Sequence, residues 1–272
     1  MNYRTRRVFA TTLTLLAVGL TALALEWTRM RMGDESTLSG WTLIASTAGL
    51  YLLSARKQLV GPRWGPVAMW MQMHVYMGTF ASIVFLMHIG WPIRGVFESA
   101  LAAVFAFVAV TGMLLGRLSR TMPKRLAAIP KDHPLERVPA LQLAVAREAH
   151  QVAMASAEHG EGATLAEYYQ RRLLPYFQTP RRWVYLIVPN GLRRRSLLRE
   201  LNDLDRYLAE HGIQSRRSLS AMVQAKDDLD FQHALQTRLR TMFMLHVSLT
   251  WALALMIAVH VVLVYRFQGA ML

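Results

Sequence analysis

Five long apolar runs alternate with polar segments along this chain of 272 residues. The runs cover roughly 8–25, 38–55, 67–91, 96–116 and 241–265. Each is close to the ~20 residues that cross a bilayer as a helix. Charged residues are nearly absent from the runs and concentrated between them. The pattern therefore predicts five membrane-spanning helices.

A long polar segment separates the fourth run from the fifth. We therefore expect three parts: residues 1–117 with four spanning helices, an inserted domain at 118–240, and 241–272 with the fifth helix and a short tail. Breakers and periodicity predict that the insert is mostly helical, with helices near 140–158, 164–175, 193–210 and from 215 onward. Only Trp183–Val188 has a β-like pattern, closed by a Pro-Asn-Gly turn. The expected fold class is all-α.

The net charge of +14 lies mainly in the loops and the insert, so it predicts orientation rather than nucleic-acid binding. Basic clusters mark three helix ends as cytoplasmic: Arg4, Arg6 and Arg7; Arg56, Lys57 and Arg63; Arg117, Arg120, Lys124 and Arg125. The prediction is a multi-pass protein of the cytoplasmic membrane in contact with lipid. Its amino terminus and insert face the cytoplasm, and its carboxyl terminus faces outward.

The chain contains no cysteine. This excludes covalently attached c-type haem, cysteine-ligated iron–sulfur clusters and thiolate zinc sites within the chain. A dinucleotide fingerprint and a phosphate-binding loop are also missing from the sequence. Any redox centre must use other ligands, and electrons must enter and leave through quinol or partner subunits.

Only four histidines fall within the predicted spans: His74 and His88 in the third, His246 and His260 in the fifth. The two spacings are equal, since 88 − 74 = 14 and 260 − 246 = 14. In a helix, such a spacing returns within about 40° of the same face and separates the two residues by about 21 Å. Each helix therefore presents two imidazoles on one face, one near each leaflet.

The predicted topology makes these two helices parallel, so their histidines should meet level by level. We expect His74 opposite His246 on the cytoplasmic side and His88 opposite His260 on the outer side. Two imidazoles on opposite faces of a macrocycle are the axial ligands of a bis-histidine haem. The pattern predicts two b-type haems. The alternatives are hydrogen-bonded interior histidines and a metal site, although the separation of about 21 Å prevents all four from sharing one ion.

The two histidine pairs resemble those of membrane-embedded dihaem b-type cytochromes. That family includes the cytochrome b of quinol-oxidising complexes and the ferric reductase-like transmembrane group, which the placement on the third and fifth helices resembles more closely. The resemblance implies two stacked haems. The chain differs from the ferric reductase-like group in its domain-sized insert. It also lacks the Pro-Glu-Trp-Tyr motif of the cytochrome b of quinol-oxidising complexes.

Other residues are candidates for contact with these cofactors. Gly78 lies one turn after His74, where a side chain would meet the macrocycle. Five arginines at predicted helix ends could bind haem propionates: Arg94 and Arg266 on the outer side, and Arg63, Arg238 and Arg240 on the inner side. Glu98, near the outer face, is a candidate proton acceptor beside a quinone. The alternative role of Gly78 is close helix packing, and that of the arginines is contact with lipid headgroups. The alternative role of Glu98 is that of an ordinary carboxylate at a helix amino terminus.

The predicted function is that of an electron-transfer subunit of an oxidoreductase complex. It would link the quinone pool to other redox subunits, including an extracytoplasmic electron carrier, with the insert acting through its surface and binding no cofactor. One alternative is a stand-alone reductase of an external acceptor, either ferric iron or oxygen. The other is a non-haem anchor or transporter whose histidines bind metal or protons.

Overall fold

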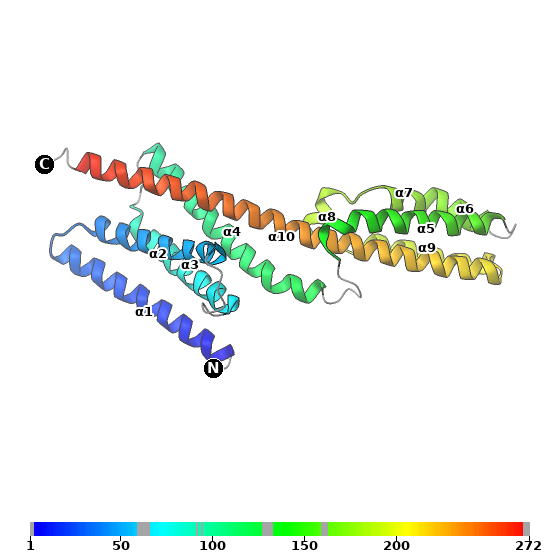
Figure 1. Cartoon of the computed structure of the whole chain (residues 1–272), viewed down its shortest axis with the longest axis horizontal. Helices are drawn as coiled ribbons and strands as arrows, with labels where there is room; N and C mark the ends of the chain where they lie inside the picture. The colour runs from blue at the N-terminus through cyan, green and yellow to red at the C-terminus, as the bar shows by residue number, and fades with distance from the viewer. Residues whose placement is uncertain are drawn as a thin grey trace. The chain divides into compact units, whose positions relative to one another are not determined.

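The computed structural model describes residues 3–58, 66–90, 92–93, 95–126, 133–158 and 163–268. Within these ranges all regular structure is helical, which confirms the predicted all-α class (Figure 1). The long helices are α1 (Tyr3–Met30), α2 (Glu35–Gln58), α3 (Val67–His88), α4 (Val96–Leu126), α5 (Val138–Glu158) and α10 (Glu210–Gln268). The shorter ones are α6 (Ala163–Tyr168), α7 (Leu174–Gln178), α8 (Trp183–Ile187) and α9 (Leu192–Asp203).

The chain forms two compact units. Unit 1 comprises Met1–Arg117 and Phe243–Leu272, and unit 2 comprises Leu118–Met242. Helices α4 and α10 each contribute to both units. In unit 1, α1, α2 and α3 pack against one another, as Figure 1 shows.

Among the residues that the structure describes, three helical segments are long and apolar enough to cross a membrane: Arg4–Met30, Val96–Leu126 and Glu210–Phe267. The last contains the fifth predicted span, in its carboxyl-terminal part. Helices α2 and α3 are not among the three, because small polar residues in α2, and Gln72, His74 and His88 in α3, lower their hydropathy. The apolar surface of the three segments indicates contact with membrane lipid.

The connection between α1 and α2 is built around Asp34. Its Oδ1 accepts hydrogen bonds from the backbone N–H of Ser36, at 2.9 Å, and from the Ser36 hydroxyl. Its Oδ2 accepts from Thr37. These hydrogen bonds hold the pKa of Asp34 below its usual value, and those from the Ser36 and Thr37 side chains have the largest effect. Asp34 therefore acts as the N-cap of α2 and determines where that helix begins.

Unit 2 has its own apolar core. It is centred on buried side chains of α5, the segment from α6 to α7, α9 and α10, including Ala149, Tyr169, Leu201 and Leu219. The predicted first helix of the insert corresponds to α5. The second does not stop near Pro175 but continues to Gln178, because a π-turn at Tyr169–Leu173 places the proline in the first turn of α7, where it needs no N–H partner.

Two further sequence predictions for unit 2 are wrong. Trp183–Val188 is not an extended strand, because residues Trp183–Ile187 form the helix α8. In this helix the side chain of Tyr185 is buried, with 8 % exposure. The predicted helix at 193–210 ends earlier, since α9 stops at Asp203 and a 3₁₀ turn, Leu204–Tyr207, follows it. In both places tertiary packing overrides the local signal.

A buried ionic network joins α10 to the segment that precedes α8. Arg181 donates to Asp227 at 2.6 Å and to Asp230 at 2.7 Å, and its guanidinium lies over the rings of Tyr176 and Tyr185. Lys226 pairs with Asp230 at 2.9 Å. Burial raises the pKa of Asp227 and lowers that of Lys226. The network fixes the chain where it enters α8, because its members would be costly to leave unpaired in the interior.

A second ionic contact of unit 2 lies nearer its surface. Glu200 of α9 accepts two hydrogen bonds from Arg172, at 2.9 and 2.8 Å. Further bonds come from Ser196 at 2.8 Å and from Tyr168 at 3.2 Å. The pKa of Glu200 is lowered to about 2, mainly by the hydrogen bonds from Arg172. This contact ties α9 to the π-turn.

Candidate haem-binding site

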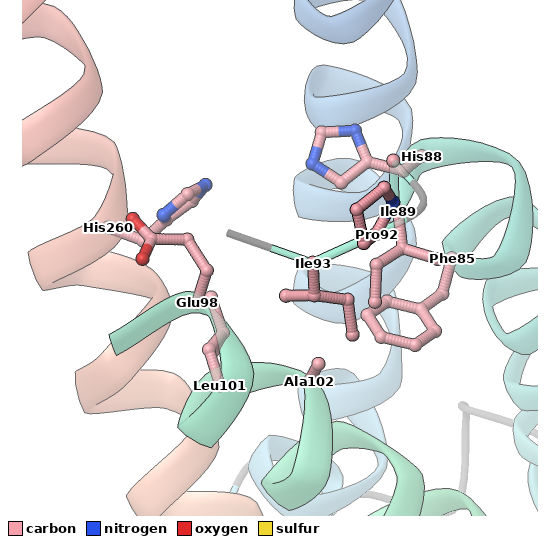
Figure 2. Close-up of a pocket in the computed structure, with 10 residues that line it drawn as sticks. Phe85, His88, Ile89, Pro92, Ile93, Glu98, Leu101, Ala102 and His260 are labelled. Atoms are coloured by element: carbon pink, nitrogen blue, oxygen red, sulfur yellow. The ribbon is translucent and has the colours of Figure 1, made fainter. Parts of the chain in front are cut away.

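A cavity of about 450 Å³ in unit 1 is lined by two of the four predicted ligands, His88 from the end of α3 and His260 from α10. Figure 2 shows the two imidazoles on opposite sides of this cavity. The rest of the wall is mostly apolar, formed by Phe85, Ile89, Pro92, Ile93, Leu101 and Ala102 with Gly90 and Glu98. Its volume is within the range of cofactor sites.

Each of these two imidazoles has a defined neighbour. His88 Nδ1 lies 2.8 Å from the hydroxyl of Ser39 on α2. The His260 ring stacks against Phe97, with ring centroids 6.4 Å apart and planes 17° from parallel. The two histidines also interact electrostatically with each other. The structure therefore brings together residues 172 positions apart (260 − 88 = 172), which the sequence predicted would meet.

The Ser39 contact fits one tautomer of His88. The Ser39 hydroxyl has a second partner, the backbone carbonyl of Glu35 at 2.8 Å. When the hydroxyl donates its single proton to that carbonyl, its oxygen accepts from Nδ1–H of His88. In that tautomer Nε2 of His88 is unprotonated, and its lone pair is available to a metal. Such a contact to the distal nitrogen is a general feature of metal-binding histidines.

The same arrangement recurs at His246 on α10. Its Nδ1 lies 3.0 Å from the hydroxyl of Thr111 on α4. The Thr111 hydroxyl also lies 2.8 Å from the carbonyl of Phe107. When it donates its proton there, its oxygen accepts from Nδ1–H of His246, and Nε2 of His246 has a free lone pair. One histidine of each predicted pair is thus oriented by a hydroxyl of a neighbouring helix.

A glycine follows each of these hydroxyl residues and leaves room for the imidazole. A Cβ added to Gly40 would lie 3.3 Å from Cε1 of His88, and one added to Gly112 would lie 3.0 Å from Cε1 of His246. These distances are shorter than ordinary carbon contacts. The hydroxyl-glycine dipeptides Ser39-Gly40 and Thr111-Gly112 therefore form two equivalent histidine supports.

The cytoplasmic pair predicted from the sequence is His74 and His246. The two imidazoles interact electrostatically, as those of His88 and His260 do. Nδ1 of His74 is buried, and among the described residues it has no hydrogen-bond partner. A buried polar nitrogen without a partner is costly, so Nδ1 of His74 is an unsatisfied polar atom inside unit 1.

Midway between the two histidine levels, each of the two helices has one buried apolar residue. Ala81 is seven residues from His74 and from His88, and Leu253 is seven from His246 and from His260. Seven residues return within about 20° of the same helix face, about 10 Å along the axis. Ala81 is only 2 % exposed and Leu253 only 3 %. A buried apolar side chain therefore separates the two histidines of each helix.

The other predicted contact residues are placed differently. Gly78 faces α2, where an added Cβ would make only an ordinary contact with Leu50 at 3.9 Å. Arg266 is exposed near the end of α10. Arg238 donates to the carbonyl of Ile187 at 3.1 Å, and Arg240 pairs with Glu136 at 3.5 Å. Haem contact by these residues stays a prediction. Arg63 and Arg94 lie outside the described residues.

Glu98 occupies the helix-terminus position considered for it and also lines the cavity. It lies in the first turn of α4, and its carboxylate folds back over Gly95, which has a φ of 95° and no room for a Cβ. This is the position of a carboxylate that stabilises a helix amino terminus. The same side chain lines the cavity of His88 and His260 (Figure 2). Its role as a proton acceptor stays a prediction.

Sequence reasoning missed Ser39, Gly40 and Thr111. The available signal was a hydroxyl residue followed by glycine inside an apolar helix, which occurs once in α2 near the level of His88 and once in α4 near that of His246. Across the described ranges, no group of three or more histidine, aspartate and glutamate side chains could hold a metal ion. A haem does not need such a group, because the porphyrin supplies four ligands and the protein only two.

No protein-family model, curated protein or solved structure matches this chain. The function is therefore inferred from the histidines and the cavity of unit 1.

Proposed function

We propose that the chain is a dihaem b-type membrane cytochrome. It acts as an electron-transfer subunit that carries electrons across the bilayer between the quinone pool and partner redox subunits. The observation that carries this proposal is the apolar cavity of about 450 Å³ with His88 and His260 on opposite walls. A bis-histidine haem requires two imidazoles from opposite sides and a surrounding apolar pocket.

The proposal assigns one haem to His88 and His260 and the second to His74 and His246. In this assignment the hydroxyls of Ser39 and Thr111 accept from Nδ1–H of His88 and of His246, so that Nε2 of each imidazole is free for the iron. The axial spacing of about 21 Å puts the pairs near opposite leaflets. When bound, the haems supply one-electron transfer between the two faces of the membrane.

The protein's own residues have three tasks in this proposal. The hydroxyls of Ser39 and Thr111 orient the ligands and keep Nε2 free of a proton. Apolar walls, such as Phe85 and Leu101, exclude water and so tune the reduction potential. Glu98, at the cavity wall, is the group placed to exchange a proton with a quinol.

The membrane arrangement is part of the same proposal. All five long apolar runs span the bilayer, including those in α2 and α3. The basic clusters then place the amino terminus and unit 2 in the cytoplasm and the carboxyl terminus outside. A quinone and an extracytoplasmic electron carrier are the partners that this arrangement fits.

Haem quantitation tests the proposal directly. The purified full-length protein should contain two b-type haems per chain by the pyridine haemochrome assay. His88→Ala should remove the outer haem and leave about one, and His260→Ala should do the same. His150→Ala is the matched control, since His150 is exposed on α5 of unit 2 and should leave both haems in place.

Three results would distinguish the alternatives. A protein without haem would favour the anchor or transporter whose histidines bind metal or protons. Retention of both haems in His88→Ala would refute the ligand assignment. Rapid oxidation of the reduced, isolated protein by ferric chelates or oxygen would favour the stand-alone reductase.

A further inference from the structure

Unit 2 exposes a compact apolar surface at and after α8. Its side chains are Trp183, Val184, Ile187, Val188 and Leu192, and Trp183 is 68 % and Leu192 64 % exposed. These are five of the seven large apolar side chains that are exposed among the described residues of 118–242. A cluster of this kind on a domain surface marks an interaction site. We call it the α8 surface.

The α8 surface is held in place from behind. Tyr185, between its members in sequence, is 8 % exposed and packs under the Arg181 guanidinium, 4.8 Å from the ring centroid. At its other end, the carbonyl of Ile187 accepts a hydrogen bond from Arg238 of α10 at 3.1 Å. The apolar side chains therefore point outward because the segment is anchored.

The residues that border the α8 surface in sequence are basic. Residues 181–195 contain five arginines and no acidic residue. Arg181 and Arg194 pair with aspartates of α10, the latter with Asp228 at 3.2 Å. The guanidinium of Arg193 lies over the ring of Tyr176, 5.1 Å from its centroid. Arg182 and Arg195 are exposed and form no ion pair with any residue that the structure describes. Apolar side chains with a basic border fit an anionic lipid surface.

The attachment point on α10 lies close in sequence to the span predicted for that helix. Arg238 precedes Phe243, the first residue of α10 in unit 1, by five positions, which is about 7.5 Å of helix. The predicted fifth span begins at about residue 241, within one turn of Arg238. The α8 surface also exposes Trp183, and tryptophan is enriched at membrane–water interfaces.

We propose that the α8 surface lies in the headgroup region of the adjacent leaflet, with its apolar side chains inserted among acyl chains and with Arg182 and Arg195 on anionic headgroups. Unit 2 is then held against the membrane through α8 as well as through its two connecting helices. This inference does not depend on haem. An acidic protein partner is the other class of occupant, and the test separates the two.

The absence of native cysteine allows a clean depth measurement. Val184→Cys and, separately, Val188→Cys are spin-labelled in the full-length protein and reconstituted in nanodiscs with or without phosphatidylglycerol. Collision rates with oxygen, which partitions into lipid, are compared with those of a water-soluble nickel complex. Tyr207→Cys is the matched control, because Tyr207 is 65 % exposed and lies beside the other end of the unit 2 part of α10, about 42 Å along the helix from Arg238.

We expect oxygen collisions to exceed nickel collisions at 184 and 188, and the reverse at 207. Phosphatidylglycerol should raise the ratio of the oxygen to the nickel collision rate several-fold at 184 and 188. The double substitution Arg182→Gln and Arg195→Gln should abolish that increase. Labels at 184 and 188 that are as water-accessible as the label at 207 would overturn the proposal. So would labels that become shielded only when a partner subunit is added.

Discussion

Removing the hydroxyl behind a haem ligand should shift the potential of one haem and not the other. In the proposed assignment Ser39 supports the outer ligand His88, at 2.8 Å, and Thr111 supports the inner ligand His246, at 3.0 Å. Ser39→Ala and Thr111→Val delete the acceptor of each Nδ1–H with little change in volume. An imidazole without this acceptor donates less electron density to iron, which disfavours the ferric state.

The magnitude follows from the energy of one hydrogen bond. A neutral hydrogen bond contributes about 1 kcal/mol, and if about half of this differs between the two oxidation states, the potential rises by about 20 mV. Ser39→Ala should raise the outer haem by this amount, and Thr111→Val the inner haem. Ser46→Ala is the matched control, since Ser46 is buried in the same helix as Ser39 but donates only to the carbonyl of Thr42.

A redox titration of the purified protein, followed in the α-band of the haem spectrum, measures both potentials. Each variant should retain two haems, so that a change in potential is not confused with loss of cofactor. Equal shifts of both haems in either variant, or shifts as large in Ser46→Ala, would refute the assignment of the two hydroxyls to separate ligands.

Three further outcomes are expected. Gly112→Ala should distort the ligand field of the inner haem, because the new Cβ lies 3.0 Å from the His246 ring, and the electron paramagnetic resonance spectrum measures this change. Gly116→Ala should leave the spectrum unchanged, because no described atom beyond its own stretch of helix lies within 4 Å of a Cβ at that position. The pKa of Glu200 is lowered in the folded protein to about 2, so its contribution to stability is present above its ordinary value of 4.5 and disappears as the pH falls through 2. After allowance for solvent exposure, Glu200→Gln should cost about 1 kcal/mol at neutral pH and almost nothing near pH 2, as measured by hydrogen exchange in α9. A cysteine at Tyr207 should resist an impermeant thiol reagent in intact cells and react after permeabilisation, and the opposite result would reverse the proposed topology.

The sequence alone determined what depends on local periodicity. Apolar runs predicted the long helices, and the equal spacing of the histidines predicted which residues share a helix face, because a helix repeats regularly whatever surrounds it. The expectation that His88 and His260 approach each other also came from sequence, and both line one cavity. That step needed only the order of the helices and the spacing within each.

Tertiary structure alone decided which residues support the ligands and what α8 becomes. Ser39 is 49 residues from His88, and Thr111 is 135 from His246, so no local pattern connects them. Gly78 was chosen as a neighbour of His74 along its own helix, but the glycines that touch an imidazole are on other helices. The run at 183–188 has the composition of a strand, yet it is helical, because one turn of helix buries Tyr185 beneath Arg181 and leaves the remaining apolar side chains outside. Such contacts join distant parts of the chain, and only their packing in three dimensions determines them.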